Sequence, residues 1–172
     1  MRTLGDARMR HAAAVTAFGM RAQEVSDNQW MRAPAERKWS AAEITTHLTL
    51  TLQAFDTELR GGPPMKMRVS GFKRVLARMV YMQRILWNGR FPTGAPAPRE
   101  TRPPEKLSPR PECLRRFQEM AAELEKSIEK VNAERPNVQV THPYFGKVGL
   151  TDAVLISARH IEHHMKQLPA RD

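Results

Sequence analysis

The stretch from Leu114 to Val131 constrains the fold more than any other part of the chain. Its apolar residues recur at intervals of 3, 4, 3, 4 and 3 residues. This spacing keeps one face of an α-helix apolar along its whole length. Such a helix has to bury that face against other helices, so the stretch predicts a helix bundle. The apolar positions are Leu114, Phe117, Ala121, Leu124, Ile128 and Val131.

Four other segments also show apolar residues at helical spacing. With the first stretch they predict helices over about residues 3–25, 41–60, 70–88, 109–133 and 151–168. Each apolar side is expected to face either the core or a second copy of the chain. The first helix takes its apolar side from Leu4, Val15, Phe18, Ala22 and Val25. The third takes it from Val75, Leu76, Met79, Met82, Ile85 and Leu86.

Capping signals mark several of these helix ends. Ser40 followed by Glu43 is a capping box, in which the serine hydroxyl accepts from the Glu43 amide and the carboxylate reaches back. Residues 61–64 read G-G-P-P and end that helix, because glycine adopts left-handed caps and proline cannot continue a helix. Ser108 and Thr151 are the predicted N-caps of the last two helices.

A proline-rich connection covers about residues 89–111 and predicts one long loop between the third and fourth helices. Residues 138–140 are suited to an extended piece but are too short to predict a sheet. The expected fold class is therefore all-α. The expected architecture is a single domain over residues 1–172, in which the helices form a bundle with one long connection.

The cysteine content and the hydropathy bear on the cellular setting. Cys113 is the only cysteine, which excludes an internal disulfide framework and fits a reducing compartment such as the cytoplasm. No apolar run approaches the roughly 18 to 20 residues needed to span a bilayer. We therefore expect a cytoplasmic protein with no membrane partner.

The formal net charge of +10 is concentrated in one segment. Residues 61–110 contain eleven Lys or Arg and two Asp or Glu. Such a segment can attract anionic partners, or it can be an ordinary solvated face. Nucleic-acid binding is disfavoured, because no signature of a nucleic-acid-binding module is present. Phosphate contacts in that hypothesis would come from Lys66, Arg68, Lys73, Arg74, Arg78 and Arg84.

Three histidines are candidates for a metal site. His160 and His164 are four residues apart, so they lie on one face of the predicted last helix, beside its apolar stripe. His47 lies at the edge of the apolar stripe of the second predicted helix. Three imidazoles brought together could bind one divalent metal and leave a position open for a further ligand. Ordinary hydrogen-bonded histidines are the alternative, and the helix dipole alone favours histidine near a helix C-terminus.

Two longer motifs resemble those of a known family. Residues 39–48 read W-S-A-A-E-I-T-T-H-L and are similar to the start of the second helix in the DinB/YfiT-like metalloenzymes. Residues 142–146 read H-P-Y-F-G, and residues 160–167 read H-I-E-H-H-M-K-Q. Together these two stretches look like the ending of that family. The motifs follow the family's order and cover both ends of the chain.

The resemblance implies a four-helix bundle with one long crossover connection and a metal ion held by His47, His160 and His164. It also implies a homodimer. Some relatives are S-transferases or isomerases that use a low-molecular-weight thiol. Neutral imidazole ligands suit Zn or Ni, with Mn, Fe and Co as alternatives. Residues 61–111 match nothing in the family, so the resemblance does not extend to a substrate.

Three functions remain open on the sequence. The first is a metal-dependent transferase or hydrolase acting on a small molecule, in which the metal activates a thiol or water. The second is a non-catalytic, dimeric metal-binding bundle, in which the ion supports folding or dimerisation. The third is nucleic-acid binding. Glu43 and Cys113 are assigned structural roles, and Trp30, Trp39 and Trp87 are assigned to packing.

Overall fold

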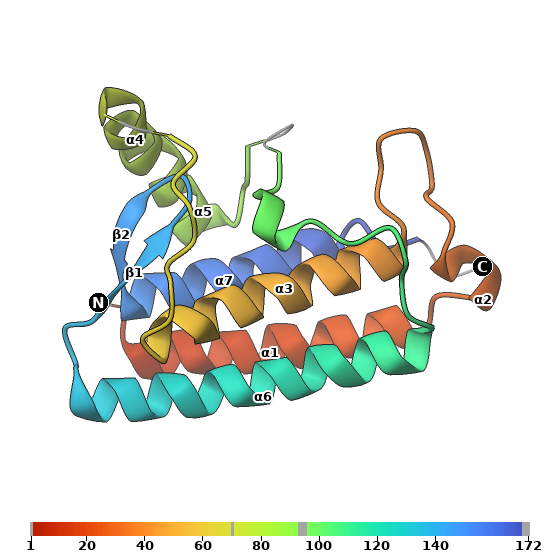
Figure 1. Cartoon of the computed structure of the whole chain (residues 1–172), viewed down its shortest axis with the longest axis horizontal. Coiled ribbons are helices and arrows are strands. Elements are labelled where there is room, and N and C mark those ends of the chain that lie inside the picture. The colour runs from red at the N-terminus through yellow and green to blue at the C-terminus, as the bar shows by residue number, and fades with distance from the viewer. Residues whose placement is uncertain (1, 70, 93–95, 170–172) are drawn as a thin grey trace.

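A computed structural model describes residues 2–69, 71–92 and 96–169 of the chain. Four long helices lie side by side (Figure 1). They are α1 (Leu4–Gln23), α3 (Ala41–Leu59), α6 (Arg110–Glu134) and α7 (Leu150–Met165). Helix α1 packs on α7 and α6, and α3 packs on α6 and α7. The prediction of a mostly helical chain is confirmed.

Shorter elements occupy the connections between these helices. Helix α2 (Asp27–Trp30) lies between α1 and α3. The long connection from α3 to α6 contains α4 (Gly71–Ala77), the π-helical turn η1 (Arg78–Met82), α5 (Gln83–Asn88) and the 3-10 turn η2 (Arg99–Thr101). Among the residues described, no helix combines the length and the apolar character needed to cross a bilayer.

The segment formed by α4, η1 and α5 differs from the single apolar side expected for it. In a regular α-helix, Met82 and Leu86 would share a face with Val75 and Met79. The wider turn of η1 changes the helical phase. Met82 and Leu86 are therefore buried, whereas Val75 and Met79 are exposed.

A two-stranded antiparallel hairpin precedes α7, so the expectation of no sheet is wrong. Strand β1 (Gln139–His142) pairs with β2 (Gly146–Gly149), and Val140 lies opposite Val148. Both valines are buried in the core. Gly146 has φ 74°, a left-handed conformation that glycine adopts without strain. Strands of four residues are too short to produce a periodicity that can be recognised in the sequence.

The start of α3 is predicted correctly, and two other starts are not. The Glu43 amide donates to Ser40 Oγ at 3.2 Å, and the Ser40 amide donates to Glu43 Oε2 at 2.7 Å. Helix α6, however, begins after Pro109, and α7 begins after Gly149. Ser108 and Thr151 are therefore not the N-caps. The chain enters α7 directly from β2, which places Thr151 inside the first turn.

One core fills the space between the four long helices. Phe18 of α1 and Phe117 of α6 are fully buried, with ring centroids 5.0 Å apart. Leu48 and Leu52 of α3 and Ile161 of α7 are at most 1% exposed. Burial of these side chains supplies the main stabilising contribution to the packing of the four helices.

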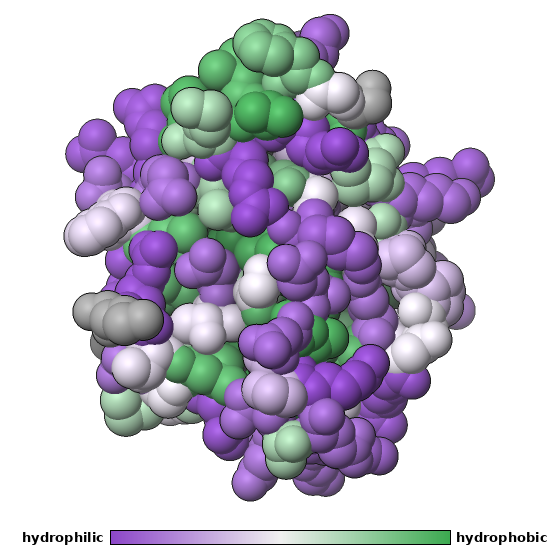
Figure 2. Space-filling model, turned by 90° about the vertical axis from the view of Figure 1, so that its left-hand side faces the viewer, coloured by the Kyte–Doolittle hydropathy of each residue, from purple (hydrophilic) through white to green (hydrophobic). Residues whose placement is uncertain are grey.

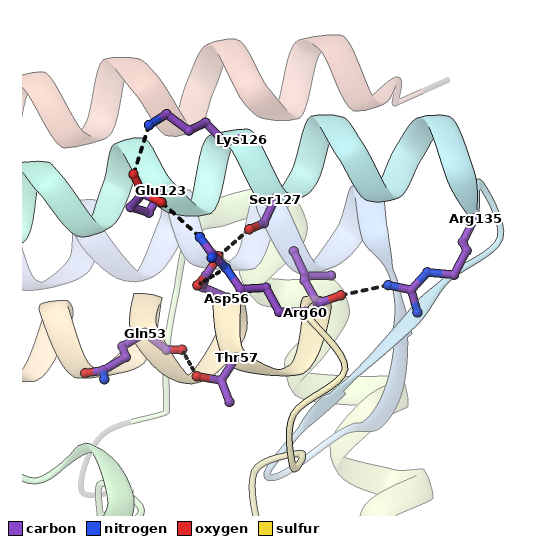
Figure 3. Close-up of polar contacts among 9 residues, drawn as sticks. Gln53, Asp56, Thr57, Arg60, Glu123, Lys126, Ser127 and Arg135 are labelled. Carbon is purple, nitrogen blue, oxygen red and sulfur yellow. Dashed lines mark hydrogen bonds and ion pairs between the residues drawn. The ribbon is translucent and has the colours of Figure 1, made fainter.

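A cluster of polar side chains also joins α3 to α6 (Figure 3). Ser127 donates to the buried carboxylate of Asp56, and Arg60 Nε lies 2.8 Å from Asp56 Oδ2. Arg60 also donates to Glu123 at 2.9 Å, and Arg135 donates to the last carbonyl of α3 at 2.7 Å. These directed contacts fix the position of α3, the helix that carries His47, against α6.

The buried face of α1 is centred on His11 rather than on Val15. Ala7, His11, Ala14 and Phe18 are buried, and Val15 is only half-buried. Within the described residues, His11 Nε2 has no hydrogen-bond partner. Burial of the imidazole lowers its pKa to about 4.

We expect the substitution His11→Leu to reduce the loss of stability on acidification. The folded-state pKa of about 4 lies below the ordinary value of 6.5, so the unfolded chain binds this proton first as the pH falls. The wild type should lose up to about 3 kcal/mol of unfolding free energy through this group as the pH falls from near 6.5 toward 4. Urea unfolding at neutral and mildly acidic pH measures the loss. Equal losses in both proteins would contradict the assignment.

Candidate metal centre

The three histidines singled out from the sequence meet between α3 and α7. His47 comes from the second turn of α3, and His160 and His164 come from the last turns of α7. His160 Nε2 lies 3.4 Å from His47 Nε2 and 3.0 Å from His164 Nε2. One ligand atom from each residue lies within 4.8 Å of the other two. Helical spacing brings His160 and His164 together, and the packing of α3 adds His47.

Two of the rings are held in a fixed orientation and tautomer. His47 Nδ1 lies 2.7 Å from the Thr101 carbonyl of η2, and His164 Nδ1 lies 2.9 Å from Gln167 Oε1. A carbonyl oxygen can only accept, so each Nδ1 carries the proton. In the neutral rings, Nε2 of His47 and of His164 is therefore unprotonated, with its lone pair directed toward His160 Nε2.

Burial lowers the pKa of all three imidazoles. The pKa of His164 falls to about 3. The pKa of His160 falls well below its ordinary value, first through burial and then through repulsion from His164 and His47. For His47, burial lowers the pKa more than the hydrogen bond to the Thr101 carbonyl raises it. All three rings are therefore neutral near pH 7, the form that binds metals.

Aromatic rings enclose the histidines on two sides. Trp39 lies next to His47, with centroids 4.7 Å apart, and stacks on His164 at 6.0 Å. Phe91, from the proline-rich connection, lies 5.5 Å from His160. These contacts restrict rotation of the imidazoles and shield them from water.

The histidines form part of the wall of a cavity of about 1070 Å³. Other walls come from the loop before α3, from the hairpin, from the segment 71–88 and from the proline-rich connection. Phe55 and Ile85 contribute apolar surface, whereas Lys38 and Lys73 contribute positive charge. A cavity of this size and composition can accept a small organic molecule.

The donor atoms fit a divalent transition metal. Neutral imidazoles are common ligands of such metals. Oxygen partners at Nδ1, such as the Thr101 carbonyl and the Gln167 amide, are typical of histidines that bind a metal through Nε2. Because three protein ligands do not complete a tetrahedral or larger coordination shell, this set leaves a position open toward the cavity.

Two other histidines border the cavity outside this group. His142 stacks on Phe145 with centroids 4.2 Å apart, and its Nδ1 accepts from the Tyr144 amide at 3.3 Å. This contact lies within the turn between β1 and β2. Burial lowers the pKa of His142 to about 4. His163 Nε2 lies 2.9 Å from Gln167 Nε2, which extends the hydrogen-bonded chain behind His164.

The remaining residues weighed from the sequence are mostly placed as expected. The Cys113 thiol is buried and donates to the Ser108 carbonyl at 3.2 Å, and burial raises its pKa. Trp30 is buried. Trp87 is 72% exposed, so its assignment to interhelix packing is wrong. Trp87 lies in the last turn of α5, which ends at Gly89 in a left-handed cap.

Three contributors to the site were not identified as such from the sequence. Thr101 acts through its backbone carbonyl, which no side-chain pattern can reveal. Phe91 belongs to the proline-rich connection, where no motif guides an assignment. Trp39 begins a recognised motif, yet a tryptophan next to a helix start is ordinarily a packing residue.

Replacing Gln167 by Ala is expected to lower the affinity for Zn²⁺ about 10- to 100-fold. Gln167 Oε1 accepts from His164 Nδ1 and so fixes the tautomer of this ring. Removing such a hydrogen-bond partner of a metal ligand typically lowers metal affinity by this factor. Titration against a chromophoric chelator measures the affinity. Gln139→Ala, at an exposed position of β1, serves as the control. Equal affinities in the two variants would exclude the orienting role.

Comparison with known proteins identifies one family. A search of curated proteins and a search of solved structures returned no match. A family model described as the DinB superfamily matches residues 10–168. The match includes α3 and α7 and therefore all three histidines. The chain belongs to the DinB superfamily.

Proposed function

We propose that His47, His160 and His164 bind one divalent metal ion through Nε2, and that the protein is a metal-dependent enzyme acting on a small molecule. The observation that carries the proposal is the convergence of three neutral imidazoles on the wall of a large cavity. Zn or Ni fits the ligands best, with Mn, Fe or Co as alternatives. Membership of the DinB superfamily supports the assignment.

The proposed reaction is a thiol-dependent S-transfer or a hydrolysis. A bound divalent ion would acidify a thiol or water and so supply a nucleophile near neutral pH. In the S-transfer, the thiol sulfur forms a bond to an electrophilic carbon, its proton passes to solvent, and the leaving group departs with the bonding electron pair.

The residues of the cavity have separate tasks in this reaction. Phe55 and Ile85 would bind the apolar part of the substrate. Lys38 and Lys73 would bind a carboxylate of the thiol or of the substrate. Trp39 and Phe91 hold the imidazoles and exclude bulk water from them.

The arrangement of the helices is proposed to be the four-helix bundle of this superfamily. The connection between α3 and α6 would be its single long crossover. Two features support this view: the four long helices share one core, and η2 of the connection supplies a hydrogen-bond partner to His47. The homodimer implied by the family resemblance is likewise a proposal.

A test of catalysis compares wild type and His47→Ala after loading with each metal. Low-molecular-weight thiols are paired with an epoxide and with an activated aryl halide, and esters are tested without thiol. The proposal predicts turnover above background by the loaded wild type and none by His47→Ala. If the loaded wild type binds metal in full but accelerates none of these reactions, the ion supports structure only, and the enzyme proposal fails.

A further inference from the structure

One face of α4 and η1 is apolar and points to solvent. Phe72, Val75, Leu76 and Met79 follow the spacing i, i+3, i+4 and i+7. Their exposed fractions are 79, 50, 50 and 69%. A stripe with this spacing on a helix normally faces a protein core. Exposed apolar patches of this kind mark sites of interaction.

The outward orientation is held by contacts on the other side of the segment. Arg78 donates to the carbonyl of Lys147 in β2. The side chain of Arg74 lies so close to Gly146 that a Cβ there would approach its Cδ to 3.1 Å. Ile85, in the following helix α5, is buried in the core. The stripe therefore cannot turn inward without breaking these contacts.

The surroundings of the stripe are strongly cationic. Between Glu58 and Glu100 the sequence has no Asp or Glu, and it contains nine Lys or Arg. Lys66, Arg68 and Arg84 are exposed. On a helical wheel of α4, Lys73 falls on one flank of the apolar stripe. An apolar stripe flanked by basic residues is typical of helices that lie in the surface of an anionic membrane.

The shape of the molecule leaves this surface accessible. Helix α4 lies at the edge of the molecule, beyond the hairpin and away from α1 and α6 (Figure 1). Figure 2 shows the apolar patch at the top of the molecule, with hydrophilic side chains below it. A flat surface can therefore contact the patch without first meeting the four long helices.

We propose that α4 and η1 dock the protein on anionic phospholipid membranes. The stripe enters the headgroup region, and the exposed side chains of Lys66, Arg68 and Arg84 contact the lipid phosphates. Docking of this kind needs no membrane-spanning segment. The expectation of no membrane partner rested only on the absence of such a segment, and the proposal replaces it.

A second copy of the chain is a less suitable occupant of the stripe. A two-fold contact through the stripe would bring the same patch of both copies together. The segment 59–99 contains no Asp or Glu, and its two copies would then face each other. Their repulsion opposes association, whereas an anionic lipid surface neutralises the same charges.

Flotation with lipid vesicles tests the proposal on the full-length protein. The vesicles consist of phosphatidylcholine alone or of equal parts of phosphatidylglycerol and phosphatidylcholine. The double variant F72S/M79S removes the two most exposed side chains of the stripe. The matched control is M9S/M20S, which changes two α1 methionines that are 67 and 65% exposed. Circular dichroism verifies that each variant is folded.

The wild type and M9S/M20S should float with the anionic vesicles and much less with phosphatidylcholine. F72S/M79S should lose at least about tenfold in partitioning. Removing one of the exposed basic residues with Arg84→Ser should lower partitioning about fivefold. The proposal is overturned if the wild type does not float, if it floats equally with both vesicle types, or if F72S/M79S floats like the wild type. It is also overturned if sedimentation velocity shows a wild-type dimer that F72S/M79S dissociates.

Discussion

His160→Ala is expected to lower the affinity for Zn²⁺ or Ni²⁺ by more than about 100-fold. His160 Nε2 is the central donor, 3.4 Å from His47 Nε2 and 3.0 Å from His164 Nε2. Removing a hydrogen-bond partner of a metal ligand typically lowers metal affinity 10- to 100-fold. Removing the ligand atom itself should have a larger effect. Competition with a chelator of known affinity measures the change.

His163→Ala is the matched control for this variant, because it changes a histidine on the same helix that lies outside the group of three. Its side chain offers no ligand atom to the group and contacts it only through Gln167 and through ring packing on His164 and Phe91. The affinity of this variant for the metal should therefore fall by no more than about tenfold. Similar affinities for His160→Ala and wild type would mean that the metal is bound elsewhere. A loss in His163→Ala as large as in His160→Ala would mean that the ligand set is wrongly assigned.

Phe117→Ala is expected to have the largest effect on stability, a loss of about 4 kcal/mol in the free energy of unfolding. Phe117 is 0% exposed and its ring lies 5.0 Å from that of Phe18, so truncation leaves a cavity between α1 and α6. Urea unfolding of the metal-free protein measures the loss. Gln118→Ala, at the exposed neighbouring position of α6, should change the stability by less than about 0.5 kcal/mol. A loss below about 1 kcal/mol for Phe117→Ala would show that this pair is not central to the core.

The long helices were predictable because each carries a local signal. The regular apolar spacing of α6 and the capping box at Ser40 depend only on residues close in sequence. His160 and His164 were predictable for the same reason, since helical spacing alone places them together. The prediction of His47 depended on its position at the edge of an apolar stripe and on the resemblance of residues 39–48 to a known motif.

Other features depend on contacts that no local pattern encodes. The π-helical turn η1 changes the phase of one helix and thereby exposes Met79 while burying Leu86. The hairpin consists of strands too short for periodicity, and its position follows from the core packing of Val140 and Val148. The hydrogen bond to His47 comes from a backbone carbonyl far along the chain. These features arise from tertiary packing rather than from propensity.

The most direct test of the metal site is the metal content of the wild-type protein. The protein is purified without an affinity tag or added metal and analysed by mass spectrometry. The site described here predicts close to one divalent ion per chain. A chain that stays empty, even after incubation with Zn, Ni, Mn, Co and Fe, would contradict the assignment of His47, His160 and His164 as metal ligands.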